Sequence, residues 1–124
     1  MGVSRLRPAL LILLLIPAEA EPQEPRITLP PGFTISVFAS GFDRARFMAV
    51  DPRGTLLLSD PGAGKVLALP DADRDGKADR VVEVLGGLSR PHGLAFQDGK
   101  LLVGDADRIV RFSYDPATMR ASMP

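Results

Sequence analysis

The stretch Gly54-Thr55-Leu56-Leu57-Leu58-Ser59-Asp60 recurs 45 residues later as Gly99-Lys100-Leu101-Leu102-Val103-Gly104-Asp105. The flanking segments also correspond: Ala49-Val50 with Leu94-Ala95 at the same offset, and residues 65–67 with 108–110 at an offset of 43. Repeats of about 40 to 50 residues that contain several short strands are typical of β-propeller blades. The repeat therefore predicts an all-β protein built from β-propeller blades.

Short apolar runs separated by turn residues surround the repeat. These runs are rich in branched side chains, and no window after Glu21 keeps a helical period over about ten residues. We expect strands at residues 34–39, 46–50, 55–59, 65–69, 80–85, 101–103 and 108–114. One blade then spans about residues 46–85. A second, incomplete blade spans about residues 91–124, because no fourth strand is evident in its polar end.

Two blades cannot close a ring, which is how propellers protect the edges of their sheets. We therefore interpret the chain as the leading part of a longer protein; the alternative is a complete and unusually small β-sheet domain. The strand at 34–39 would be the outer strand of a closing blade. Alone, the chain would expose apolar edges at residues 35–38 and 108–114, so we expect it to aggregate or unfold.

The composition of the 124 residues excludes several classes of protein. Fifteen basic and fifteen acidic residues cancel, so net charge indicates neither a nucleic acid partner nor an anionic membrane surface. The chain has no cysteine, which excludes disulfide frameworks, thiolate zinc sites and cysteine nucleophiles.

The first twenty residues have the features of a secretory signal peptide. Arg5 and Arg7 supply the positive charge, residues 9–16 form an apolar core, and Ala18-Glu19-Ala20 matches a cleavage site. An apolar core of this length is too short to span a bilayer, which needs about 20 residues. We expect cleavage after Ala20, no membrane span afterwards, and a secreted or periplasmic protein. A proline-rich lead-in then covers residues 21–33, before a partial propeller at 34–124.

Four segments resemble one known family. Residues 29–33 (LPPGF) lead into residues 35–39 (ISVFA), as at the opening of that family. Residues 46–54 (RFMAVDPRG) resemble its first inner strand and turn, residues 69–79 its acidic hairpin, and residues 90–96 (RPHGLAF) the entry to its next blade. The family is the glucose/sorbosone dehydrogenases, which are sugar dehydrogenases that depend on the quinone PQQ.

The resemblance implies a six-bladed propeller with PQQ over the central channel. The quinone takes a hydride from a sugar or polyol, calcium binds the quinone, and electrons pass to an acceptor such as a cytochrome. In the family a histidine base and most quinone-binding residues come from later blades, so no catalytic residue is carried over and we expect this chain alone to be inactive. The alternatives are a non-catalytic propeller module that binds protein or carbohydrate, and a propeller lactonase that uses a metal.

The acidic segment after residue 70 has the spacing of a calcium loop. Carboxylates at positions one, three, five and nine, a glycine at six and a carbonyl at seven favour a calcium ion. The candidate ligands are Asp71, Asp73, Asp75, Asp79 and the carbonyl of Lys77. Val82 replaces the glutamate expected at position twelve, so the loop is not an EF-hand. The alternative is a solvated acidic turn balanced by neighbouring basic side chains.

His92 is the only histidine. The repeat places it opposite Phe47 at the start of an inner strand, with Arg46 and Arg90 nearby in register. We predict that His92, Arg90 and Arg46 line the cofactor cleft, where the imidazole would act as a base or a hydrogen-bond donor. The alternative is a structural histidine whose ring nitrogen bonds a neighbouring backbone group after Pro91.

Overall fold

The computed structural model describes residues 27–124. The predicted signal peptide and the first part of the lead-in lie outside this range. The chain divides into two units, Met1–Phe33 and Thr34–Pro124. The described part of the first unit contains one turn, in which the N–H of Phe33 donates to the carbonyl of Pro30 at 3.2 Å.

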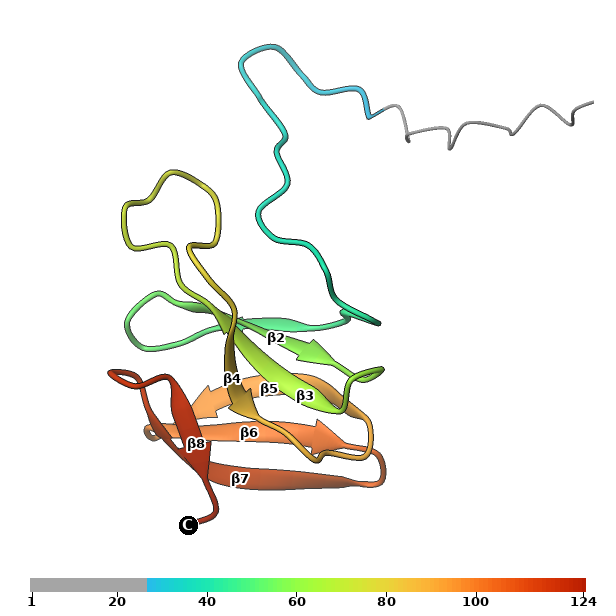
Figure 1. Ribbon diagram of the computed structural model, residues 1–124, viewed down its shortest axis with the longest axis vertical. Helices are drawn as coiled ribbons and strands as arrows, with labels where there is room; N and C mark the ends of the chain where they lie inside the picture. Colours follow the sequence, from blue (N-terminus) through green and yellow to red (C-terminus); the bar gives the residue numbers. More distant parts are fainter. Residues whose placement is uncertain (1–26) are drawn as a thin grey trace, which may run out of the picture. The chain divides into compact units, whose positions relative to one another are not determined.

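The second unit holds two four-stranded antiparallel sheets, which confirms the all-β prediction (Figure 1). The strands of each sheet follow one another in chain order, as in a propeller blade. The first sheet contains β1 (Met48–Val50), β2 (Leu56–Asp60), β3 (Lys65–Leu69) and β4 (Val82–Leu85). The second contains β5 (Pro91–Gln97), β6 (Lys100–Asp105), β7 (Arg108–Asp115) and β8 (Arg120–Ser122). Residues 27–124 include no helix of the length and apolarity that a membrane span requires.

The strand register confirms most of the repeat and corrects one part of it. Asp60 pairs with Lys65 and Asp105 pairs with Arg108, as the offsets of 45 and 43 require. The hairpins before these pairs differ in length. Five residues (51–55) lie between the paired residues Val50 and Leu56, whereas only four (97–100) lie between the equivalent pair, Phe96 and Leu101. The offset between β1 and β5 is therefore 46, and Ala95-Phe96, rather than Leu94-Ala95, occupies the place of Ala49-Val50.

The prediction of a strand at residues 34–39 is wrong. This segment forms no ladder with any described residue, and Ile35 and Val37 are 63% and 72% exposed. An offset of 46 places residues 36–39 in the position of β4, the outermost strand of its sheet. Such a strand needs the third strand of its own blade as a partner, and residues 27–124 do not supply one.

The second blade is not incomplete, because β8 supplies its fourth strand. A turn built on Asp115 reverses the chain: its carboxylate accepts hydrogen bonds from the N–H of Ala117 and the hydroxyl of Thr118. Met119 completes the turn at a φ of 54°. The strand is three residues long with one small apolar side chain, so the apolar pattern gave no signal for it.

The apolar faces of the two sheets meet in a single core. Each blade contributes four buried side chains, and strands β2 and β5, β1 and β5, and β4 and β8 lie next to one another. The buried set consists of Leu57, Val66, Ala68 and Val84 from the first blade and Leu101, Val103, Phe112 and Met119 from the second. The first sheet also buries Leu58, Leu67 and Leu69 outside this core. The apolar contact between the sheets stabilises both of them.

A polar contact joins the two blades at the turn that follows β1. The hydroxyl of Tyr114 donates to Oδ2 of Asp51 at 2.9 Å, while Oδ1 of Asp51 accepts the N–H groups of Arg53 and Thr55 at 2.8 Å each. Burial and this hydrogen bond to Asp51 raise the pKa of Tyr114 above its ordinary value of 10.0. The ring of Tyr114 also meets Phe96 edge-on at 5.1 Å.

We predict that Tyr114→Phe lowers the free energy of unfolding by about 1–3 kcal/mol, because the buried Asp51 carboxylate loses a partner. Because the pKa of Tyr114 is higher in the folded than in the unfolded state, it stabilises the folded protein below the unfolded pKa, and this stabilisation is lost as pH rises. The wild type should therefore lose stability above about pH 10, and the variant should lose less. Denaturant unfolding at pH 7 and pH 10.5 measures both effects. Thr118→Val, which removes an exposed hydrogen bond, is the control; equal losses in the two variants would contradict the prediction.

Candidate functional site

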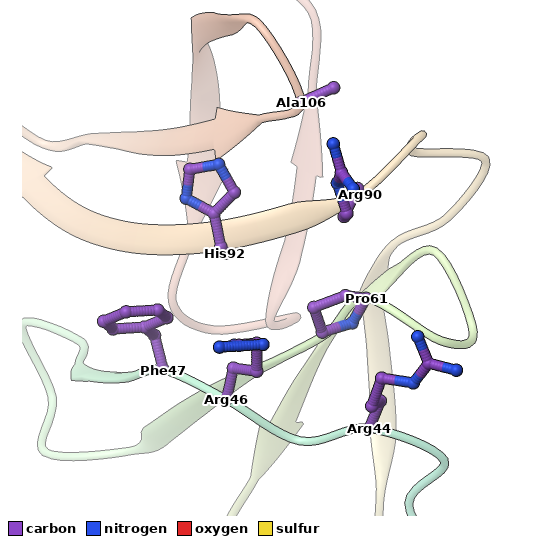
Figure 2. Close-up of a pocket in the computed structure, with 7 residues that line it drawn as sticks. All are labelled: Arg44, Arg46, Phe47, Pro61, Arg90, His92 and Ala106. Carbon is purple, nitrogen blue, oxygen red and sulfur yellow. The ribbon is translucent and has the colours of Figure 1, made fainter.

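A cavity of about 420 Å³ lies between the two blades (Figure 2). Three arginines, one histidine and one phenylalanine are among the residues that line it. The lining residues are Arg44, Arg46, Phe47, Pro61, Arg90, His92 and Ala106. The structure thus places all three residues predicted from the sequence, Arg46, Arg90 and His92, on one cavity. It adds Arg44, which sequence reasoning missed.

A buried carboxylate positions the arginine-bearing segment of the first blade. Asp60, 2% exposed at the end of β2, accepts the N–H groups of Asp43 and Arg44 at 3.0 and 2.8 Å. The N–H of Ala63, across the β2–β3 turn, adds a third bond at 3.4 Å. Burial raises the pKa of this carboxyl, but the N–H donors outweigh burial and leave the pKa below its ordinary value. Asp60 is therefore an anion, and its carboxylate holds the backbone at Arg44.

The second blade repeats this clamp. Asp105 accepts the N–H groups of Ser89 and Arg90 at 3.2 and 2.6 Å, and it too is buried. Because Asp60 and Asp105 correspond, Arg44 and Arg90 are equivalent positions at an offset of 46. That offset is the signal in the sequence that finds Arg44.

The same offset corrects the register proposed for His92. His92 is equivalent to Arg46, and not to Phe47, because the β5 hairpin is one residue shorter than the β1 hairpin. In Figure 2 the imidazole lies on the far side of β5 from Arg46 and Phe47. Its Nδ1 accepts the N–H of Gly93 at 2.8 Å, which agrees with the structural reading of this histidine.

The cavity is electrostatically positive. The ion pairs among residues 27–124 are Lys65–Glu83 and Arg108–Asp107, and neither involves a lining residue. Within that part of the chain the three guanidinium groups of the cavity have no carboxylate partner. Arginine binds planar carboxylates through paired N–H donors. The arrangement is suited to an anion that carries carboxylate or similar oxygen groups.

The structure gathers part of the predicted calcium loop. Ligand oxygens of Asp71, Asp73 and Asp79 lie within 4.8 Å of one another. Asp75 is not in this group; its carboxylate accepts the N–H of Lys77 at 2.8 Å. Hydrogen bonds from N–H groups inside the loop order the other carboxylates, such as that from Ala72 to Asp79 at 2.8 Å. Calcium binding stays a prediction of the sequence.

The fold and this cavity define the chain as a pair of β-propeller blades with a cationic cavity between them. It belongs to the TrAA12-like family, whose model matches residues 27–124. Among solved structures it is similar to the holo form of the PQQ domain of a pyranose dehydrogenase from Coprinopsis cinerea, with 26% sequence identity and a TM-score of 0.60. That match covers 68% of this chain but 21% of the solved chain, so the sequence spans about a fifth of that domain. No curated protein matches it.

We predict that Asp60→Asn lowers the free energy of unfolding by about 1–3 kcal/mol at pH 7, because an amide offers the N–H groups of residues 43 and 44 a poorer acceptor. Because the pKa of Asp60 is lower in the folded state than the unfolded value of 3.8, it stabilises the folded protein above that value, and this stabilisation is lost as pH falls. The difference from wild type should therefore shrink at pH 3. Denaturant unfolding at both pH values measures it. The exposed Asp107→Asn is the control; a matching small effect in both variants would contradict the clamp.

We predict that calcium binds the acidic loop with a dissociation constant of about 10⁻⁴ to 10⁻³ M, the range of extracellular modules. Asp71→Asn should weaken binding about tenfold or more, because it removes one of three converging charges. Titration calorimetry with calcium chloride measures the affinity. Asp98→Asn, which lies outside the cluster, is the matched control. Absence of calcium binding at about 10 mM would show a solvated acidic turn instead.

Proposed function

We propose that this chain contributes two blades to a PQQ-dependent sugar oxidoreductase domain. The likeness to the PQQ domain of a pyranose dehydrogenase supports the cofactor and the general reaction. The observation that carries the proposal is the set of three guanidinium groups, without carboxylate partners among the described residues, on one cavity between the blades.

The residues of the cavity fit PQQ by the chemistry of their donors. Arg44, Arg46 and Arg90 would hold its carboxylates, since guanidinium groups bind such oxygens in pairs. Phe47 is 51% exposed and offers an aromatic face against which a flat ring system would stack. A volume of about 420 Å³ is in the usual range of ligand pockets. When bound, the quinone supplies the hydride acceptor, and the residues of this chain hold and orient it.

The finer parts of the proposal rest on the family resemblance. The substrate would be an aldose, a related polyol or a sorbosone-type sugar, and a protein such as a cytochrome would accept the electrons. We place the enzyme in the periplasm or outside the cell, because the first twenty residues have the features of a signal peptide. The histidine base would come from other blades.

Binding of PQQ tests this proposal. Titration calorimetry on the protein produced from its natural gene should show binding, and Arg46→Gln or Arg90→Gln should weaken it about 10- to 100-fold through loss of a charge-assisted hydrogen bond. Arg111→Gln removes the same charge at an exposed residue outside the cavity and should leave the affinity unchanged.

Equal weakening in all three variants would mean that the arginines act only through net charge. No binding by the wild type would contradict the proposal and favour the other functions, a propeller binding module or a metal-dependent lactonase. PQQ-dependent dye reduction with sugars then tests the reaction itself.

A further inference from the structure

The turn between β2 and β3 is longer than its counterpart in the second blade. Four residues (61–64) lie between the last paired residues of β2 and β3, whereas two (106–107) lie between those of β6 and β7. The longer turn ends in Gly64, whose φ of 65° lies in the left-handed region that favours glycine. The two additional residues have no equivalent in the second blade, so the repeat does not account for them.

Gly64 joins this turn to the segment that enters the second blade. Its carbonyl accepts the N–H of Leu88 at 3.0 Å. A Cβ atom at residue 64 would lie 2.5 Å from the carbonyl oxygen of Leu88, so the two backbones approach more closely than a side chain would allow. Arg90 follows two residues later, and its own N–H is held by Asp105 at 2.6 Å. The turn of the first blade therefore fixes the segment that carries Arg90.

Residues at the beginning of the same turn hold the two other arginines that line the cavity. The carbonyl of Ser59 accepts the N–H of Arg46 at 3.0 Å. The carboxylate of Asp60 accepts the N–H of Arg44 at 2.8 Å. Residues 59–64 thus form hydrogen bonds with the backbone of each segment that brings an arginine to the cavity.

The backbone placement of these arginines matters for an anion that more than one of them binds. A guanidinium group binds a carboxylate through paired N–H donors in a fixed geometry. Two such contacts to one rigid anion form together only where the spacing of the arginines matches that of the carboxylates. A displaced arginine still binds a carboxylate, but its contact no longer adds to that of its neighbour. A residue that fixes the spacing therefore acts on affinity through the arginine that it places.

We propose that Gly64 is a positioning residue for Arg90, which it places so that Arg90 binds the same anion as Arg44 and Arg46. Gly64 is not among the residues that line the cavity, so it acts through Arg90. The placement of the backbone follows from contacts within this chain, whereas the identity of the anion as PQQ rests on the proposed function.

Hydrogen exchange of the ligand-free, full-length protein, followed by mass spectrometry, tests the placement. Gly64→Ala adds a Cβ that displaces Leu88, so peptides covering residues 86–92 should exchange about tenfold faster than in the wild type. Gly54→Ala is the matched control, because Gly54 also has a positive φ, of 91°, but nothing lies within 4 Å of its Cβ position. Unchanged exchange in Gly64→Ala, or the same acceleration in Gly54→Ala, would overturn the proposal.

A second pair of variants makes the same comparison with less backbone strain. Asparagine tolerates the left-handed conformation better than alanine does, and it still adds a Cβ. Where Gly64→Ala does not fold, Gly64→Asn takes its place and Gly54→Asn becomes the control. The expected and the contradicting results stay the same.

Binding of PQQ tests whether Gly64 acts through Arg90. Gly64→Ala should weaken binding about tenfold, but by no more than about twofold once Arg90→Gln has removed the guanidinium group. Arg111→Gln, outside the cavity, is the control background, in which the full loss should persist. A further loss of similar size in the Arg90→Gln background would show a general structural effect and overturn the positioning role.

These readouts separate this inference from the proposed function. If the wild type does not bind PQQ, the proposed function fails, and hydrogen exchange still decides whether Gly64 places the segment of Arg90. If the wild type binds PQQ and Gly64→Ala binds it equally well, only the role of Gly64 is overturned.

Discussion

The apolar contact between the two sheets is the constraint on which the other features depend. Leu57 and Val66 of the first blade and Leu101 and Val103 of the second are fully buried in one core. A four-stranded sheet with one apolar face has no stable state while that face is exposed to water. The contact also fixes where the polar groups lie. The segments that lead into β1 and β5, together with the turns after β2 and β6, form the cationic cavity. Asp51, in the turn after β1, meets Tyr114.

The repeat explains how the cavity acquires both order and specificity. Asp60 and Asp105 are the same residue at equivalent positions, and each binds the backbone where the chain enters an inner strand. This aspartate clamp is common to both blades. The positions of Arg46 and His92 differ, and the change from Ser59 to Gly104 accompanies that difference. The two blades therefore share one scaffold but carry different residues, Arg46 and His92, at equivalent positions on the cavity. Such differences are where selectivity for a ligand would arise.

Much of the fold was predictable because the seven-residue repeat and its spacing are independent of tertiary context. The failures have physical causes. Residues 34–39 have a strand-like pattern but no partner strand among the described residues, and β8 has a partner strand but almost no apolar pattern. The site was partly predictable: Arg46, Arg90 and His92 line one cavity, yet a hairpin shorter by one residue hid the equivalence of Arg44 and Arg90. Hydrogen bonds from backbone to side chain, such as that from Gly93 to His92, leave no trace in a pattern of residue types.

We propose that the guanidinium groups between the blades hold the carboxylates of a quinone. A crystal structure of the full-length protein, soaked with PQQ, tests this proposal. Carboxylate oxygens of the quinone should lie within hydrogen-bond distance of at least two of Arg44, Arg46 and Arg90. PQQ bound at a site that none of these side chains reaches would contradict it.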